Sequence, residues 1–158
     1  MNRRLLALVL LPSISLPGCI FAVAVSPSSA DANIVIIGRW SGTTSDSAGS
    51  AAGVWALTQN GTALTGTTQI SDSTRNLAGD GTIRGTVNGK SISFHMEVPA
   101  GGFAGAMAPC SMVLDGEGTL ADDGRKITGS YTGSLAGTIG PQRSCGGILS
   151  RGTFSMAR

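Results

Sequence analysis

Charged and aromatic side chains are scarce in this chain, and histidine occurs only once. Charged residues make up 13% of the 158 residues and aromatic residues 4%. So little charge argues against intrinsic disorder, which requires high charge and low hydrophobicity. One histidine excludes a metal site built from several histidines. The 24 glycines argue against a helical bundle, because each glycine inside a helix costs about 1 kcal/mol relative to alanine.

The N-terminal segment 1–32 has the pattern of a signal peptide, which leaves 33–158 for a single domain. Small residues at Ser28-Ser29-Ala30 and Ala30-Asp31-Ala32 fit ordinary signal peptidase. Leu16-Pro17-Gly18-Cys19 instead resembles a bacterial lipobox, in which Cys19 carries a lipid and begins the mature chain. Its proline and the apolar stretch that follows depart from that pattern. The alternatives are a secreted or periplasmic protein, an outer-membrane lipoprotein attached through its lipid, and an uncleaved anchor.

Cleavage after Ala30, which leaves Asp31 in place, gives a mature chain with no net charge. With Arg3 and Arg4 in the leader, 9 of the 11 basic residues remain against 9 acidic residues. The remaining lysines and arginines are scattered, whereas nucleic-acid binding needs a clustered basic surface. We therefore expect no nucleic-acid partner.

Cys110 and Cys145 are the two cysteines outside the leader. In an oxidising compartment such an isolated pair is expected to form a disulfide. Their separation of 35 residues corresponds, in the chain-entropy account, to a stabilisation of about 3 to 4 kcal/mol. A metal-binding thiol or a thiol nucleophile has little support, because only one histidine is present to assist it.

Three dipeptides predict three β-hairpins: Asn60-Gly61, Asn88-Gly89 and Asp123-Gly124. Such dipeptides favour two-residue type I′ turns, because both central residues of that turn need a positive φ. A two-residue turn fixes which residues lie opposite each other. In all three hairpins one face then collects the large apolar residues and the other collects threonine, serine and charges. The predicted pairs are Leu57 with Leu64, Trp55 with Gly66, Ile83 with Phe94, Gly81 with Met96, Thr82 with His95, Leu120 with Ile127, and Gly116 with Tyr131.

Further strands are predicted at Ile34–Thr44, at Cys110–Leu114 in phase with the third hairpin, and at Ile148–Met156. The count of eight and the regular spacing are typical of an up-and-down meander. Pairing of the last strand with the first would remove both open edges. The predicted fold class is therefore all-β, a single antiparallel up-and-down barrel of eight strands. Such a barrel is filled by its own side chains or holds one small ligand.

Gly38-Arg39-Trp40 resembles the Gly-x-Trp motif of the lipocalin and avidin barrels, and Gly61–Thr67 resembles an avidin strand. The resemblance covers 38–70 and extends to overall size and strand count, and it implies a calycin-type barrel. Avidins surround biotin with several tryptophans, whereas this chain has two. They also carry an asparagine where this chain has Gly42. The resemblance therefore does not imply biotin binding.

A ligand inside the barrel would be lined by the large inward residues Trp40, Trp55, Phe94 and Tyr131. The loop Pro99–Pro109 carries Phe103 and is predicted to cover the barrel mouth, since functional segments are often loops on a rigid scaffold. The alternative for this loop is a connection packed on the barrel rim.

Catalytic chemistry has little support in the sequence. His95 is predicted on the polar face, in solvent. Asp115 and Glu117 lie two residues apart on one strand and resemble the paired carboxylates of a glycosidase, but they are expected only to solubilise the exterior. No catalytic residue, metal site or cofactor is predicted, and the oligomeric state is left open.

The function predicted from the sequence is that of a non-enzymatic barrel, exported or attached to the envelope, that binds a small apolar or amphipathic ligand. The alternative is a structural or interaction module with a filled interior. Such a module would bind a partner protein or a surface glycan through its exterior, which is rich in threonine and serine. A hydrolase is the least favoured interpretation.

Overall fold

The computed structural model describes residues 34–158 apart from residues 48, 74–75, 142 and 147–149. The chain divides into two units, Met1–Ala30 and Asp31–Arg158, and the described residues belong to the second. The predicted leader, the lipidation of Cys19 and both cleavage points lie outside the described residues.

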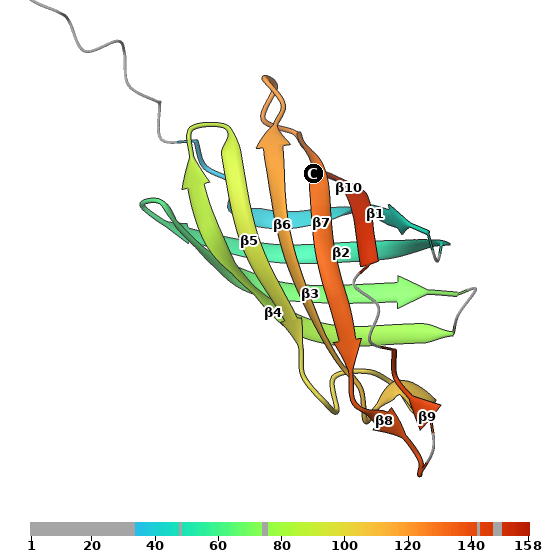
Figure 1. The fold of residues 1–158 in the computed structure, drawn as a ribbon. Helices are drawn as coiled ribbons and strands as arrows, with labels where there is room; N and C mark the ends of the chain where they lie inside the picture. The colour runs from blue at the N-terminus through green and yellow to red at the C-terminus, as the bar shows by residue number, and fades with distance from the viewer. Residues whose placement is uncertain (1–33, 48, 74–75, 142, 147–149) are drawn as a thin grey trace, which may run out of the picture. The chain divides into compact units, whose positions relative to one another are not determined.

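Eight strands close into an antiparallel barrel, which confirms the predicted fold class (Figure 1). Each strand pairs with its neighbour along the meander, and the last strand closes the barrel on the first. The barrel strands are β1 (Gly38–Asp46), β2 (Gly49–Asn60), β3 (Ala63–Asp72), β4 (Leu77–Asn88), β5 (Ser91–Val98), β6 (Ser111–Leu120), β7 (Lys126–Ala136) and β10 (Ser150–Ala157).

Little other regular structure accompanies the barrel. The short strands β8 (Thr138–Ile139) and β9 (Arg143–Ser144) pair with each other between β7 and β10. Within the described ranges, helical structure is limited to one 3₁₀ turn at Gly105–Met107. No helix in this part of the chain combines the length and the hydropathy that crossing a bilayer requires.

The third predicted hairpin has the predicted register, with Leu120 opposite Ile127 and Gly116 opposite Tyr131. Its turn is not of type I′, however, because Gly124 has a φ of 67° whereas Asp123 has no positive φ. The first two hairpins are shifted by two residues. Their strands continue through both asparagines, so that Asn60 pairs with Ala63. The second hairpin is shifted in the same way, since Asn88 pairs with Ser91.

The shift arises from where glycine sits in the turn. Gly61 and Gly89 are the first central residues and have φ of 58° and 55°, whereas neither following residue has a positive φ. A positive φ at the first position alone is the requirement of a type II′ turn, not of type I′. Corrected pairs in the first hairpin are Leu57 with Gly66, Gln59 with Leu64 and Trp55 with Thr68. In the second hairpin they are Ile83 with Met96, Gly85 with Phe94, and Arg84, in place of Thr82, with His95.

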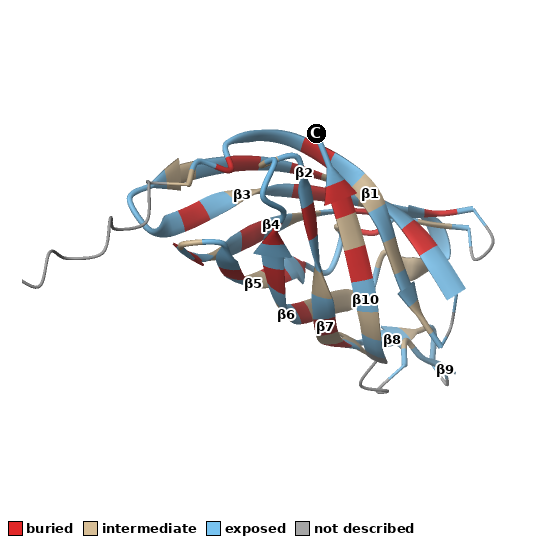
Figure 2. Cartoon of the chain, turned by 90° about the horizontal axis from the view of Figure 1, so that it is seen from above, coloured by how far each residue is buried: buried red, intermediate tan, exposed pale blue. Residues whose placement is uncertain are grey.

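The predicted faces are nevertheless correct. Side chains alternate with a period of two, so a shift of two residues leaves every side chain on the same side of the sheet. Figure 2 shows the result as buried positions alternating with exposed ones along the strands. The inward face includes Trp55, Leu64 and Ile83, all buried.

One end of the barrel is closed by the segment before β1, together with Trp40. Ile36 and Trp40 are completely buried, and the indole Nε1 of Trp40 donates a hydrogen bond of 2.9 Å to the carbonyl oxygen of Ile36. Gln59, near the end of β2, accepts a hydrogen bond from the Ile36 amide and donates one to the Ile34 carbonyl. The Arg158 guanidinium lies 4.8 Å from the Trp40 ring centroid, within cation–π range. Trp40 therefore fills this end of the barrel.

Large rings opposite glycines give the barrel its middle layer. A β-carbon at Gly116 would lie 2.3 Å from the Phe94 ring, and one at Gly152 would lie 2.5 Å from the Tyr131 ring. These positions leave the rings the room that a side chain on the neighbouring strand would occupy. The pattern matches the prediction that bulky side chains oppose glycine in a tightly curved sheet.

The predicted disulfide is present between Cys110 and Cys145, whose Cα atoms are 5.8 Å apart. Cys110 precedes β6 and is completely buried, while Cys145 follows β9. The bridge therefore ties the start of β6 to the connection that leads from β7 to β10.

Candidate ligand-binding cavity

The interior is hollow at the end opposite Trp40. The β2–β3, β4–β5 and β6–β7 connections lie at the closed end, and the β1–β2, β3–β4, β5–β6 and β7–β10 connections lie at the other, where Figure 1 shows β8 and β9. A cavity of about 320 Å³ opens there. Its volume falls near the lower bound of the range of about 300 to 1,000 Å³ that is typical of small-molecule sites.

Aromatic and other apolar side chains form the floor and walls of the cavity. Three rings meet at its floor, with centroid distances of 5.0 Å between Trp55 and Phe94, 5.3 Å between Trp55 and Phe154, and 5.4 Å between Phe94 and Phe154. Edge and tilted contacts at such distances are the favourable arrangements for aromatic pairs. The other principal apolar wall residues are Ile70, Leu77, Met96, Met112, Leu114 and Leu135.

Polar groups gather along one side of the cavity, near the ends of β1 and β7. The Tyr131 hydroxyl donates a hydrogen bond of 3.1 Å to a carboxylate oxygen of Asp46, the last residue of β1. Thr44, Ser47 and Ser134 also line the cavity. The site therefore combines an apolar floor with hydrogen-bonding groups on one wall, which is the usual composition of a small-molecule pocket.

The structure brings three of the five predicted ligand-binding residues together. Trp55, Phe94 and Tyr131 line the cavity. Trp40 lies at the closed end of the barrel, and Phe103 also lies outside the lining. Ligand contact by all five stays a prediction.

Asp46 was missed because the predicted first strand ended at Thr44, two residues too early. The signal was available in the sequence: Trp40, Gly42, Thr44 and Asp46 share one parity, so an extension in phase would have placed the carboxylate on the inward face.

The loop around Phe103 packs on the barrel wall. Phe103 is 2% exposed and forms an isolated bridge with Gly79 on β4. The amide of Asp80 donates to the Gly102 carbonyl at 2.9 Å, and the amide of Ala104 donates to the Ala78 carbonyl at 2.8 Å. The loop thus continues the sheet beside the first residues of β4. This is the packed connection that the sequence left open as the alternative to a lid.

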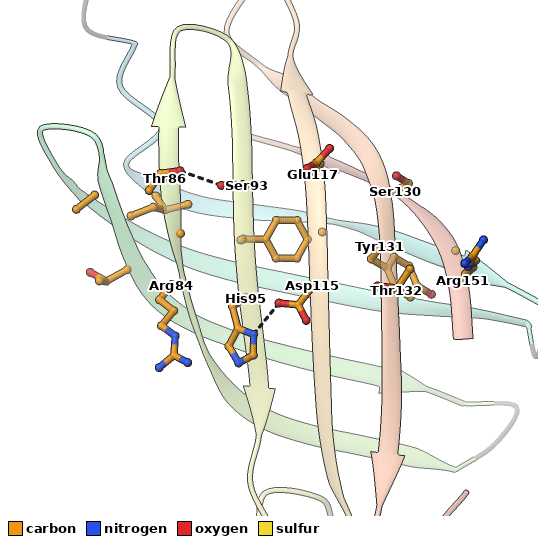
Figure 3. A pocket seen from close by; sticks show the side chains of 17 residues that line it. Arg84, Thr86, Ser93, His95, Asp115, Glu117, Ser130, Tyr131, Thr132 and Arg151 are labelled. Atoms are coloured by element: carbon orange, nitrogen blue, oxygen red, sulfur yellow. Dashed lines mark hydrogen bonds and ion pairs between the residues drawn. The ribbon is translucent and has the colours of Figure 1, made fainter. Parts of the chain in front are cut away.

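His95 and the two carboxylates singled out in the sequence lie on the outside of the barrel. His95 Nδ1 is 2.7 Å from a carboxylate oxygen of Asp115 on the neighbouring strand (Figure 3). Glu117 lies two residues further along β6. Within the described ranges, no three histidine, cysteine, aspartate or glutamate side chains come together in a way that could hold a metal ion.

Comparisons with known proteins bear on the fold of the chain. No family model matches the chain, and no curated protein matches it. A solved structure described as "Structure of EF1p2_mFAP2b bound to DFHBI" is similar to it, with a TM-score of 0.56 at 17% sequence identity. The similarity covers 77% of this chain and 92% of that chain. At this identity the likeness establishes the shared fold.

Proposed function

We propose that this protein is a non-enzymatic binding protein that holds one small apolar or amphipathic ligand inside its barrel. The observation that carries the proposal is the cavity of about 320 Å³, floored by Trp55, Phe94 and Phe154. Burial of an apolar ligand against these rings would supply the binding free energy, at about 25 cal/mol for each Å² of apolar surface removed from water. The similar structure is described as bound to DFHBI, which supports a ligand-holding role for barrels of this architecture.

The lining favours a ligand with one polar group. The apolar part would rest on the three rings, and the polar part would lie beside the Tyr131 hydroxyl and Asp46. The cavity volume suits a compact ring system or a short acyl chain better than a long lipid. The filled-barrel alternative requires an interior without ligand-sized space, and the cavity counts against it.

Export and family membership complete the proposal. The Cys110–Cys145 disulfide is compatible with an oxidising compartment outside the cytoplasm. The leader would direct the chain there, either as a secreted or periplasmic protein or as a lipoprotein anchored through Cys19. The closed eight-stranded barrel, with the Gly-x-Trp tryptophan filling one end, supports a place in the avidin and lipocalin group.

The two tryptophans provide a test of the binding site, because Trp55 lines the cavity and Trp40 lies at the closed end. We expect an apolar ligand to change the fluorescence of a Trp40→Phe variant, whose remaining tryptophan is Trp55. The matched Trp55→Phe variant, which retains Trp40, should show little change. Titration of both variants with a panel of lipophilic compounds makes the measurement, and native mass spectrometry of protein purified from its source identifies any ligand already bound.

A reversed pattern, in which only Trp40 responds, would place binding outside the cavity. Absence of any response from either variant, together with empty protein from the natural source, would contradict ligand binding and favour the structural module.

A further inference from the structure

A second hollow lies on the outside of the barrel, across strands β3, β4, β5, β6, β7 and β10 (Figure 3). We call it the outer furrow; its volume is about 990 Å³. Its floor follows a row of residues that lie opposite one another across the strands. In this row the side chains of Leu64, Phe94 and Tyr131 are buried in the barrel, and the residues between and beyond them are glycines, so the floor is largely backbone. The row reads Leu64, Gly85, Phe94, Gly116, Tyr131, Gly152.

Polar side chains form both walls of the outer furrow. The register places one wall in the order Arg84, His95, Asp115, Thr132, Arg151. It places the other wall in the order Thr86, Ser93, Glu117, Ser130. All these residues line the hollow, so a ligand lying in it would meet hydrogen-bonding groups on both sides where it crosses β4 to β7.

Several of these groups are already held in position. His95 Nδ1 lies 2.7 Å from a carboxylate oxygen of Asp115, which leaves Nε2 as the ring nitrogen that can form a hydrogen bond with a ligand. On the other wall, the hydroxyls of Thr86 and Ser93 are 2.8 Å apart. The exposed guanidinium groups of Arg84 and Arg151 have no hydrogen bond or ion pair within the described part of the chain. Both arginines are therefore available to bind a ligand, near the two ends of the wall that also carries His95 and Asp115.

The charges on the walls indicate a neutral ligand. Two guanidinium groups and the carboxylates of Asp115 and Glu117 cancel, so neither a polyanion nor a polycation is favoured. The large exposed apolar residues of the described chain, Val35 and Ile37, lie outside the furrow. Donors and acceptors beside a floor that is largely backbone suit a chain that carries many hydroxyl groups.

The direction of the furrow argues against a peptide. Peptides commonly bind sheets by adding a strand to a free edge. The furrow instead crosses strands in the middle of a closed barrel, where every strand is already paired. Five strand spacings of about 4.8 Å give a path of about 24 Å. We propose that the outer furrow binds a neutral oligosaccharide chain, at a site separate from the cavity.

The test measures binding of neutral pentasaccharides (cellopentaose, maltopentaose and chitopentaose) by ligand-observed NMR and calorimetry. The comparison probes are an anionic galacturonate oligomer, a cationic glucosamine oligomer and a neutral peptide of serine, glycine and asparagine. At least one neutral pentasaccharide should bind, with an affinity that is insensitive to salt. The variant Arg84→Ala/Arg151→Ala should bind it at least tenfold more weakly, because two charge-assisted hydrogen bonds are removed. The control Arg39→Ala removes an exposed arginine of β1 outside the furrow and should bind as the parent does.

Four results would overturn the proposal: no binding of any neutral pentasaccharide, preference for the peptide, tighter and salt-sensitive binding of a charged oligomer, or an unchanged affinity in the double-arginine variant. Neither arginine lines the cavity, so the double variant should retain the Trp55 response to an apolar ligand. The proposal for the outer furrow and the proposal for the cavity can therefore be contradicted independently of each other.

Discussion

Replacement of Trp40 by alanine should lower the free energy of unfolding by about 3 to 5 kcal/mol, the usual cost of emptying a buried aromatic site. Trp40 is completely buried at the closed end of the barrel. The variant would lose the packing of the ring, the hydrogen bond from Nε1 to Ile36 and the contact with the Arg158 guanidinium. Chemical denaturation of the variant and the parent protein measures the difference.

Two kinds of variant serve as controls for this experiment. Trp40→Phe keeps an aromatic ring and should cost clearly less than Trp40→Ala. His95→Ala, Asp115→Ala and Glu117→Ala change the outer face and should each alter stability by no more than about 0.5 kcal/mol, as is usual for surface sites. If His95→Ala destabilised the protein as much as Trp40→Ala, the division between inner and outer faces would be wrong.

The closed barrel could be predicted because its main evidence, alternation of side chains, depends only on parity. Any even shift in pairing leaves the same residues inside. For the same reason the pattern could not detect that the first two hairpins are shifted by two residues. Gly61 and Gly89 could occupy either central position of a turn, and only the backbone shows which one they take. The Asp-Gly turn gave the correct register.

This shift explains why the outer furrow could not be predicted. In the predicted register His95 faced Thr82, whereas in the structure it faces Arg84. The contact between His95 and Asp115 also depends on the pairing of β5 with β6, which are joined by a long loop. No turn motif fixes that register, so the row of charges across the strands was not visible in the sequence.

Three residues that line the cavity could be predicted from the sequence, but the presence of an open cavity could not. Trp55, Phe94 and Tyr131 were identified as large inward side chains, and they line the hollow end. Trp40 satisfied the same criterion, yet it fills the opposite end. Whether a small barrel is filled or open depends on how the end segments fold over it. That packing brings together residues far apart in the chain, such as Ile36 and Gln59.

Removal of the disulfide is the second change with a large expected effect. The double variant Cys110→Ala/Cys145→Ala should lose about 3 to 4 kcal/mol of stability, because the unfolded chain regains the freedom of a 35-residue loop. Denaturation of the variant, and of the parent protein with and without a reducing agent, makes the measurement. In the non-reduced parent, mass spectrometry should find the tryptic peptides 91–125 and 144–151 linked.

The same variant also tests how the bridge supports the cavity. Cys145 lines the cavity, and its amide donates a hydrogen bond to the Gly137 carbonyl, so the bridge holds this part of the wall against the start of β6. Without the bridge, amide exchange should accelerate around residues 137–146 more than at the closed end near Trp40. Reduced parent protein should behave like the variant, since both lack the same covalent link. Equal stability of the variant and the oxidised parent, or free thiols at both positions in exported protein, would contradict a structural role for the bridge.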